Sequence, residues 1–269
     1  MKYFIAAVLL LSFIACDNND VNETDEEIIP QKSGIAAPAL LTYNIIAQHP
    51  HDTGSYTQGL EYYKGKMYES TGDYANSSLR ITDHKSGKVE MKHMMGSDKV
   101  FGEGITILNN KIYQLTWQSN LVYVYDVNNI AKPVQTFTWN YDGWGITNNG
   151  TDLIISDGSA NLYFVNPQDF KVKNTVAVQT NLGPVDNLNE LEFINGAVYA
   201  NIYTTEKIVK IDPESGHVTG IMEFKNLLQP EDIIEGRTDY FNGIAYDTAS
   251  KTMFITGKRW PKLFEVRLN

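Results

Sequence analysis

Residues 100–106 read Val100-Phe101-Gly102-Glu103-Gly104-Ile105-Thr106, and the arrangement of this stretch returns along the chain. In each copy a polar or aromatic residue is followed two positions later by Leu or Ile, and then by a turn and an apolar pair. The copies begin at Gln58, Glu103, Trp144, Asn189 and Asn242, with spacings of 45, 41, 45 and 53 residues. Four-stranded units that repeat every 40 to 50 residues or so are typical of β-propellers. The sequence therefore predicts an all-β chain folded as a five-bladed β-propeller.

The two ends of the repeat region predict how the ring closes. The fifth unit ends after the apolar run 263–268, one strand short of a complete blade. Residues 41–47, before the first unit, form a strand-like run that belongs to no blade. We expect this N-terminal strand to be the outer strand of the last blade, because ring closure removes an exposed sheet edge.

The N-terminus resembles an export signal. A basic start is followed by an apolar run over residues 3–15 and then by Cys16, the only cysteine in the sequence. This order is typical of a secretory signal peptide, here 1–15, and the run is too short to span a bilayer as a helix. Phe13-Ile14-Ala15-Cys16 is similar to a bacterial lipobox, which predicts lipidation of Cys16.

Residues 16–39 are expected to form an acidic, disordered tether. Six acids and one aliphatic side chain lie within residues 17–27, which is too little apolar surface to fold. We therefore place the folded propeller domain at 40–269. The chain is expected in the bacterial cell envelope, anchored to a membrane through the lipid on Cys16, facing either the periplasm or the cell surface.

Charge and composition exclude several classes of partner. The net charge is −10 with no basic stripe, which argues against nucleic acid. A single cysteine excludes internal disulfides and thiolate metal clusters, and the five histidines are scattered, so zinc catalysis is not supported. We expect no cofactor, no metal and a monomeric chain.

Equivalent repeat positions should form rings around the propeller channel. The first ring consists of the copy-initiating residues, Gln58, Glu103, Trp144, Asn189 and Asn242. The second ring lies at the ends of the following strands: Gly72, Trp117, Gly158, Tyr203 and Lys258. Such a set of amides, aromatics, one acid and one base favours a binding site over a filled structural channel. Glu103 is the natural proton-transfer group, and Lys258 can hold it ionised, orient it or polarise a carbonyl.

Structural roles remain open for several of these residues. Trp117, Trp144 and Tyr203 could simply cap the core, and Asn242 could cap a turn. Either Arg259 or Lys262 could be the inward-facing base in place of Lys258.

Eight motifs resemble the plant and bacterial glutamine cyclotransferases. They are Tyr56-Thr-Gln-Gly-Leu60, Tyr68-Glu-Ser-Thr-Gly72, Phe101-Gly-Glu-Gly-Ile105, Tyr113-Gln-Leu-Thr-Trp117, Gly143-Trp-Gly145, Asn187-Leu-Asn-Glu-Leu191, Asn242-Gly-Ile-Ala-Tyr246 and Gly257-Lys-Arg-Trp-Pro-Lys262. The resemblance covers the body from about residue 40 to the end. It implies a five-bladed propeller, without a catalytic metal, that converts the N-terminal glutamine of a peptide or protein into pyroglutamate with release of ammonia.

The resemblance also implies residue roles. The family's catalytic acid falls on Glu103, its lysine on Lys258 and its asparagine on Asn189. Its substrate-binding glutamine falls on Gln58, and its aromatic pocket on Phe101, Trp117 and Trp144. Two positions depart from the family pattern. Tyr56 stands where many members have Phe, and Tyr203 stands where Trp is usual, which affects one pocket wall. Asn242 completes the set of expected substrate-binding residues.

Two other functions stay open on the sequence alone. One is a calcium-dependent propeller lactonase or esterase in which Glu103, Asn189 and Asn242 bind the ion, although such sites usually contain more than one carboxylate. The other is a non-catalytic propeller lipoprotein that binds an envelope partner, for which an acid and a base inside an aromatic channel are unnecessary.

Overall fold

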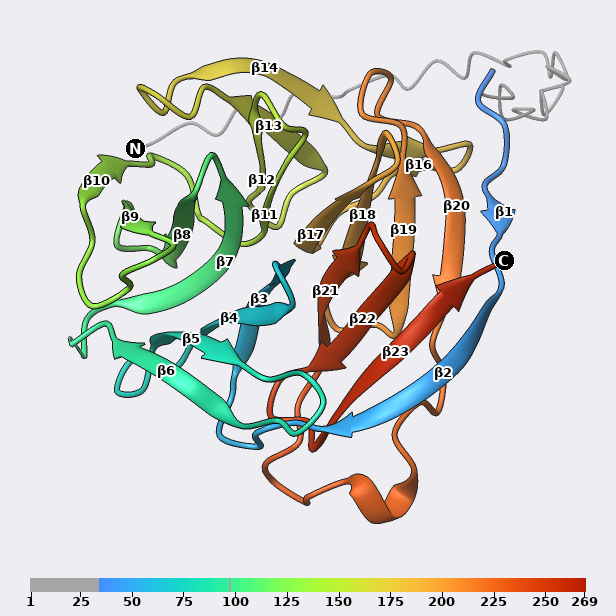
Figure 1. Ribbon diagram of the computed structural model, residues 1–269. Helices are drawn as coiled ribbons and strands as arrows, with labels where there is room; N and C mark the ends of the chain where they lie inside the picture. The colour runs from blue at the N-terminus through green and yellow to red at the C-terminus, as the bar shows by residue number, and fades with distance from the viewer. Residues whose placement is uncertain (1–33, 97) are drawn as a thin grey trace, which may run out of the picture. The chain divides into compact units, whose positions relative to one another are not determined.

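A computed structural model describes residues 34–96 and 98–269, and it confirms the five-bladed propeller. Five four-stranded antiparallel units surround a central channel (Figure 1). The innermost strands are β3 (Thr57–Tyr63), β7 (Phe101–Leu108), β11 (Ile146–Asn148), β17 (Leu188–Ile194) and β21 (Phe241–Asp247). The second strands are β4 (Lys66–Thr71), β8 (Lys111–Trp117), β12 (Leu153–Ser156), β18 (Ala197–Ile202) and β22 (Thr252–Gly257). The apolar pairs expected after each turn all lie in these second strands.

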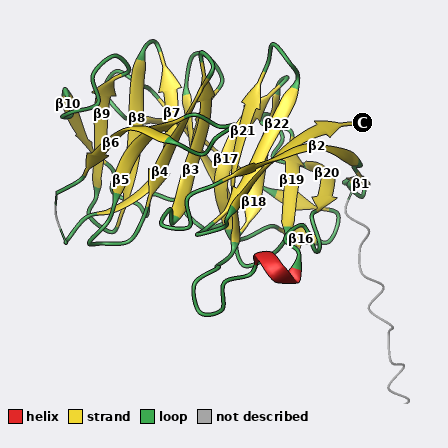
Figure 2. Cartoon of the chain, turned by 60° about the horizontal axis from the view of Figure 1, so that its bottom comes forward, coloured by secondary structure: helices red, strands yellow, loops and turns green. Residues whose placement is uncertain are grey.

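The outer half of each blade follows the same order. The third strands are β5 (Ser78–Thr82), β9 (Leu121–Asp126), β13 (Asn161–Val165), β19 (Lys207–Ile211) and β23 (Lys262–Leu268). The outer strands are β6 (Val89–Met94), β10 (Gln135–Thr138), β14 (Val172–Ala177), β20 (Val218–Glu223) and β2 (Tyr43–Pro50). Smaller elements are the hairpin β15 (Gln179–Thr180) and β16 (Gly183–Pro184), and a 3-10 turn, η1 (Pro230–Asp232), in the long β20–β21 connection (Figure 2).

The ring closes as expected from the sequence. Strand β2 pairs antiparallel with β23, from Tyr43 opposite Leu268 to Pro50 opposite Lys262. The strand begins two residues later and ends three residues later than the predicted run 41–47. A second contact was not anticipated: β1 (Ala39–Leu40) pairs in parallel with β20 of the fourth blade. The N-terminal segment therefore joins the last two blades.

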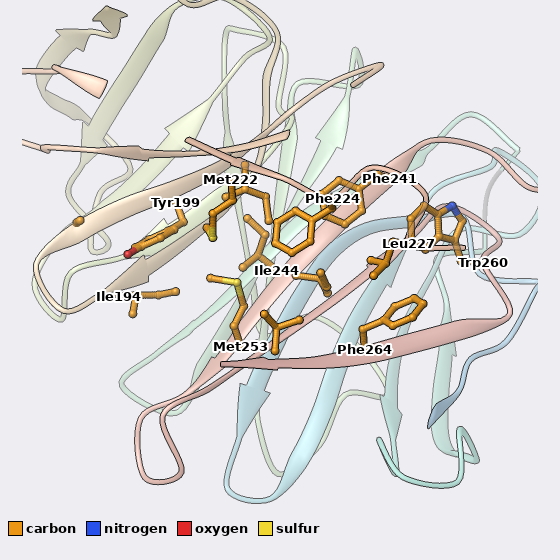
Figure 3. Packing of buried hydrophobic residues seen from close by; sticks show 14 residues of the cluster. Ile194, Tyr199, Met222, Phe224, Leu227, Phe241, Ile244, Met253, Trp260 and Phe264 are labelled. Carbon is orange, nitrogen blue, oxygen red and sulfur yellow. The ribbon is translucent and has the colours of Figure 1, made fainter. Parts of the chain in front are cut away.

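The hydrophobic core is divided among the interfaces between adjacent blades. Five buried clusters are found, and each draws its residues from two neighbouring sheets. The largest lies between the fourth and fifth blades, where Met222 and Phe224 pack near Ile244, Met253 and others (Figure 3). The interface that closes the ring, between the fifth and first blades, has the smallest cluster, with five buried apolar residues.

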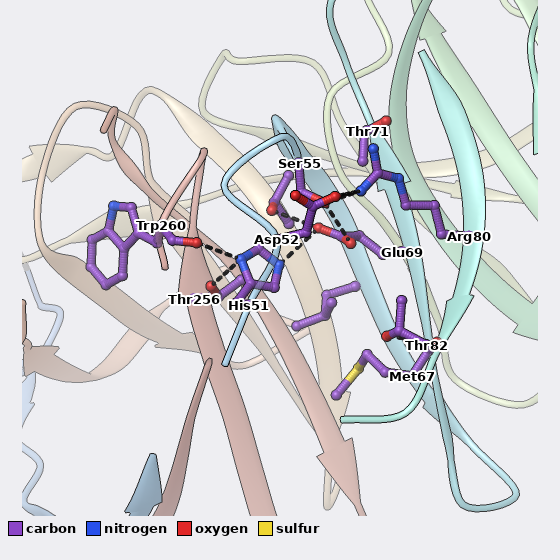
Figure 4. Close-up of polar contacts among 12 residues, drawn as sticks. His51, Asp52, Ser55, Met67, Glu69, Thr71, Arg80, Thr82, Thr256 and Trp260 are labelled. Atoms are coloured by element: carbon purple, nitrogen blue, oxygen red, sulfur yellow. Dashed lines mark hydrogen bonds and ion pairs between the residues drawn. The ribbon is translucent and has the colours of Figure 1, made fainter. Parts of the chain in front are cut away.

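A buried polar network lies at this closing interface (Figure 4). His51 is bonded through Nδ1 to the Trp260 carbonyl at 2.8 Å and through Nε2 to Glu69 Oε1 at 3.1 Å. Glu69 also accepts hydrogen bonds from Ser55 Oγ at 2.9 Å and from Thr57 Oγ1 at 2.8 Å. The network thus links the first blade to the loop after β22.

Irregularities at the start of the inner strands turn selected side chains into the channel. Register shifts occur between Thr57 and Gly59, Gly102 and Ile105, Leu188 and Leu191, and Phe241 and Ile244. Each shift falls where a copy-initiating residue lies, and a bulge of this kind re-aims a side chain. A Cβ on Gly104 would lie 2.7 Å from the Trp144 carbonyl oxygen, so the neighbouring inner strands approach closely only because this position is glycine.

Candidate active site

One cavity at one end of the channel contains most of the residues expected from the sequence. It has a volume of about 250 Å³ and is lined by Tyr56, Gln58, Phe101, Glu103, Trp117, Trp144, Asn189, Tyr203 and Lys258. These residues meet because the blades are antiparallel, so the start of each inner strand lies beside the end of the second strand. Nine of the ten catalytic and substrate-binding residues expected from the sequence are thereby brought together.

Asn242 is the tenth residue, and it lies outside the cavity lining. Its side chain is fully buried, and its Nδ2 donates to the Thr57 carbonyl at 3.1 Å and to Gln58 Oε1 at 3.4 Å. The backbone of β3 lies close enough to the start of β21 to accept a hydrogen bond from this amide. Asn242 therefore orients Gln58 from behind, and its expected contact with substrate is not seen in this geometry.

Glu103 is a buried carboxylate whose Oε1 accepts a hydrogen bond from Gln58 Nε2 at 3.0 Å. Only 4% of the residue is exposed. Burial raises the pKa of Glu103 well above its ordinary value; the positive charge of Lys258 lowers it and the negative charge of Asp142 raises it further. A carboxylate with this environment binds a proton more readily than one in water, which suits proton transfer near neutral pH.

Lys258 is the base that faces the cavity. It follows β22 directly, and its backbone N–H donates to the Tyr240 carbonyl at 2.9 Å. Its Nζ lies 4.9 Å from the ring centroid of Tyr56 and 4.5 Å from that of Tyr203, a cation–π arrangement. Burial lowers the pKa of Lys258 to about 8, against the opposing effect of Glu103 and Asp239.

The two other basic residues of this loop pair with acids outside the cavity lining. Arg259 Nη2 pairs with Asp73 at 3.3 Å, with the guanidinium 5.4 Å from the ring centroid of Tyr56, and Lys262 Nζ pairs with Asp232 of η1. Neither of them lines the cavity. The geometry therefore selects Lys258 among the three candidates.

Aromatic rings form the walls above the buried polar floor. Phe101 contacts Trp117 edge-to-face with centroids 5.7 Å apart, and Trp144 contacts Tyr203 in the same way at 5.5 Å. The glycines of the second ring make room for these walls. A Cβ at Gly72 would lie 2.2 Å from Phe101 Cε1, and one at Gly158 would lie 2.7 Å from Trp144 Cζ2.

Asn189 supplies an open hydrogen-bond acceptor. It is 3% exposed, and its Oδ1 has no partner within the part of the chain that the structure describes. Buried polar atoms are usually satisfied, so an orphaned acceptor that lines a cavity suggests that a ligand donor completes it.

Comparisons with known proteins identify the family of the chain. The family model for glutamine cyclotransferase matches residues 14–268. The chain belongs to this family. It is 39% identical over 228 residues to the glutaminyl-peptide cyclotransferase of Arabidopsis thaliana, and the aligned region covers 83% of this chain and 70% of that protein. The crystal structure of Myxococcus xanthus glutaminyl cyclase matches with a TM-score of 0.78 and 33% identity, covering 86% of this chain and 98% of the other.

Membership in the glutamine cyclotransferase family decides against the two rival functions, the calcium-dependent lactonase and the non-catalytic lipoprotein. The described residues hold no group of three or more His, Cys, Asp or Glu arranged to bind a metal ion. Nor do they form a helix long and apolar enough to cross a membrane. Cys16 and the predicted tether up to residue 33 lie outside the described residues.

Two acids near the cyclotransferase cavity were not expected from the sequence. The charge of Asp142 acts on Glu103, and the charge of Asp239 acts on Lys258. Asp142 lies two positions before Trp144, as Tyr56 lies before Gln58 and Phe101 before Glu103. This third repeat position was a signal for Asp142 and also for Tyr240, which contacts Tyr203 with centroids 5.2 Å apart. Asp239 has no such signal, because its place depends on the course of the long β20–β21 connection.

Proposed function

We propose that this chain cyclises the N-terminal glutamine of peptides or proteins to pyroglutamate and releases ammonia, with Glu103 as the proton-transfer group. The observation that carries the assignment is the buried Glu103 carboxylate in a small aromatic cavity, bonded to Gln58 and accompanied by the open acceptor of Asn189. Family membership supplies the reaction class.

The reaction needs one proton to move between two nitrogens. The α-amine of the substrate attacks its own side-chain amide carbon, which forms the new N–C bond of a five-membered ring. The carbon–nitrogen bond of the side-chain amide then breaks, and its NH₂ leaves as ammonia after gaining a proton. Ionised Glu103 accepts the proton from the attacking nitrogen and delivers it to the leaving one, so the carboxylate is regenerated.

Lys258 and the amides complement this transfer. As the amine attacks, negative charge develops on the amide oxygen, and the Lys258 ammonium is the positive group of the cavity that can stabilise it. Gln58 holds the carboxylate of Glu103 in place through a 3.0 Å hydrogen bond. Asn189 Oδ1 is free to accept a hydrogen bond from a substrate N–H group.

The aromatic walls favour ring closure over hydrolysis. Five of the nine lining residues are aromatic, Tyr56, Phe101, Trp117, Trp144 and Tyr203, and they surround a space of about 250 Å³. Such walls exclude water and restrict the folded conformers of the glutaminyl side chain. Fixing the attacking nitrogen near the carbonyl carbon is a large source of rate in an intramolecular reaction.

Ammonia release from a peptide that begins with glutamine tests the proposal. We expect the purified chain to produce ammonia and a product lighter by one ammonia, and Glu103→Gln to lose at least about 100-fold in kcat/KM. Glu192→Gln is a matched control, because Glu192 is a buried carboxylate of an inner strand outside the cavity lining. Near-wild-type turnover by a folded Glu103→Gln variant would refute the role of Glu103. Parallel reactions with and without EDTA test the expected absence of a catalytic metal.

We further propose that the chain is a monomeric lipoprotein of the bacterial cell envelope, anchored through Cys16. The support is the lipobox-like Phe13-Ile14-Ala15-Cys16 after an apolar run, followed by an acidic segment. Expression with radiolabelled palmitate should label the wild-type chain in the membrane fraction and leave Cys16→Ser unlabelled. An unlabelled wild-type chain would contradict the anchor, and light scattering of the purified chain tests the monomer.

A further inference from the structure

Lys258 is a buried cation that lacks an adjacent acid. The residue is 2% exposed, and no ion pair joins its Nζ to a carboxylate among the residues that the structure describes. Two acids act on it from farther away, Glu103 and Asp239. In the proposed reaction Glu103 gains and loses a proton, so its charge is not constant. Asp239 is then the acid near the lysine that takes no part in the proton transfer.

The backbone holds Asp239 beside Lys258. The Asp239 N–H donates to the Lys258 carbonyl at 3.0 Å, and its carbonyl accepts a hydrogen bond from Trp260 Nε1 at 2.8 Å. The next residue, Tyr240, accepts a bond from the Lys258 N–H at 2.9 Å. Asp239 and Lys258 are therefore fixed relative to one another, although they belong to different connections.

The Asp239 side chain is hydrogen-bonded to Tyr56, one of the two rings that flank the lysine, and its charge acts on the other, Tyr203. Burial raises the pKa of Tyr56, and the negative charge and hydrogen bonding of Asp239 raise it further. Burial followed by the charge of Asp239 also raises the pKa of Tyr203, whose side chain is hydrogen-bonded to that of Tyr56. The carboxylate is oriented by the Tyr240 N–H, 2.7 Å from Oδ1.

We propose that Asp239 is a positioning residue of the cyclisation: its carboxylate fixes Tyr56 and Tyr203 against Lys258 and keeps the lysine positively charged while Glu103 changes its protonation. This inference rests on the proposed function. The groups that face Lys258 are Glu103 from β7, Tyr56 before β3, Tyr203 after β18 and Asp239 before β21. The charge of Asp142 acts on Glu103, and the Arg259 guanidinium lies 5.4 Å from the Tyr56 ring centroid while its Nη2 pairs with Asp73.

The pH profile of kcat/KM for full-length Asp239→Asn tests the proposal. Without the carboxylate the pKa of Lys258 falls below its value of about 8, so the alkaline limb should move down by about one pH unit. At pH 8.5 we expect kcat/KM to fall about tenfold relative to the wild type, and at pH 6 to stay within about twofold. Asp239→Glu should restore most of the alkaline activity. The substrate amine titrates equally in all variants, so differences between them report the enzyme.

A matched control and a second readout separate this role from simple stabilisation. Asp142→Asn removes the acid that faces Glu103, so it should move the acidic limb to lower pH and leave the alkaline limb in place. Lys258 can also be titrated without substrate, by NMR of ¹³C-dimethylated lysines, with its signal assigned from Lys258→Arg.

The outcomes are distinct. A lower lysine pKa in Asp239→Asn, with the shifted alkaline limb, supports the proposal. An unchanged lysine titration, or a uniform loss of activity at all pH values, overturns it. If Asp239→Asn does not fold, Tyr56→Phe, which loses the hydroxyl but keeps the ring, must show a smaller shift in the same direction, and no shift refutes the proposal. Absence of cyclisation by the wild type would instead refute the proposed function.

Discussion

Gln58 Nε2 lies 3.0 Å from Glu103 Oε1, while the oxygen of the same Gln58 amide is 3.4 Å from Asn242 Nδ2. Three side chains from three different blades thus form one chain of hydrogen bonds that ends on the candidate catalytic carboxylate. Asn242 Nδ2 can only donate, so the group of the Gln58 amide that faces it must be the oxygen. The NH₂ group of Gln58 is therefore directed toward Glu103. This orientation stabilises the ionised form of the acid.

Gln58→Leu should therefore make Glu103 harder to ionise. A hydrogen bond to a charged group contributes about 1.5 to 3 kcal/mol, which corresponds to about 1 to 2 pH units. We expect the acidic limb of the kcat/KM profile to move upward by about that amount, with reduced activity at neutral pH. Asn242→Leu should give a smaller shift in the same direction, and an acidic limb that stays in place in both variants would contradict this role.

Gly72→Ala should damage the pocket without unfolding the propeller. The added Cβ would lie 2.2 Å from Phe101 Cε1, and Gly72 does not need a left-handed backbone, so the ring of Phe101 must move. Because Phe101 lines the cavity, we expect KM to rise about tenfold. The corresponding loss of binding free energy lies within the roughly 1 to 3 kcal/mol that overpacking costs. Gly34→Ala is a suitable control, since a Cβ there meets nothing within 4 Å. Unchanged KM in Gly72→Ala would show that the wall adapts.

The repeat in the sequence was sufficient to predict the blade number, ring closure and seven of the nine cavity-lining residues, because ring positions in a propeller follow directly from the period; Tyr56 and Phe101 were predicted from the family resemblance instead. It could not predict what happens between the repeats. Asn242 occupies a ring position, but the nearby Thr57 carbonyl and Gln58 draw its side chain away from the cavity. Asp239 and the parallel pairing of β1 with β20 depend on the path of irregular connections, for which the sequence carries no periodic signal.

The interior of the channel predicts an unusual dependence of stability on pH. Glu190 and Glu192 are buried acids of β17, and Glu61 of β3 is half-buried. Glu190 accepts hydrogen bonds from the Leu60 and Ile244 N–H groups at 3.0 and 2.7 Å. Burial raises the pKa of Glu61 to about 7 from an ordinary 4.5. Burial and then the neighbouring carboxylates Glu61 and Glu190 raise the pKa of Glu192 well above its ordinary value.

The folded state therefore keeps protons that the unfolded chain releases. The stability that these groups contribute is fully present below about pH 4.5 and is lost as pH rises through the folded pKa values, near 7 for Glu61 and well above the ordinary value for Glu192. Glu192→Gln removes one such group, so its free energy of unfolding should fall less between pH 5 and 9 than that of the wild type, by on the order of 1 to 3 kcal/mol. Urea unfolding at several pH values measures this, and parallel curves for the two proteins would contradict it.

The network of His51 and Glu69 should matter for both stability and catalysis. Burial opposes charge on both groups, but their mutual attraction prevails: the pKa of Glu69 is held below its ordinary value, and Glu69 raises that of His51 above 6.5. The contribution of Glu69 is complete above about pH 4.5 and is lost as pH falls through its lowered pKa. That of His51 is complete below 6.5 and is lost as pH rises through its raised pKa. The pair therefore contributes most to the free energy of unfolding between about pH 4.5 and pH 6.5.

Glu69→Ala would leave the charge of His51 buried without its acid, while Arg80 would keep its ion pair with Asp52 at 2.7 Å. We expect the loss of the buried His51–Glu69 pair to cost about 3 to 5 kcal/mol in the free energy of unfolding. The exposed Lys66–Glu90 pair is a control, since Lys66→Ala should cost no more than about 1 kcal/mol. His51 also holds the Trp260 carbonyl, and the Arg259 N–H donates to the Ser55 carbonyl at 2.6 Å, so the same network supports the loop of Lys258. At temperatures where Glu69→Ala remains folded, kcat/KM should therefore fall as well, whereas Lys66→Ala should keep its activity. Full activity of folded Glu69→Ala would show that the loop is held by its other contacts alone.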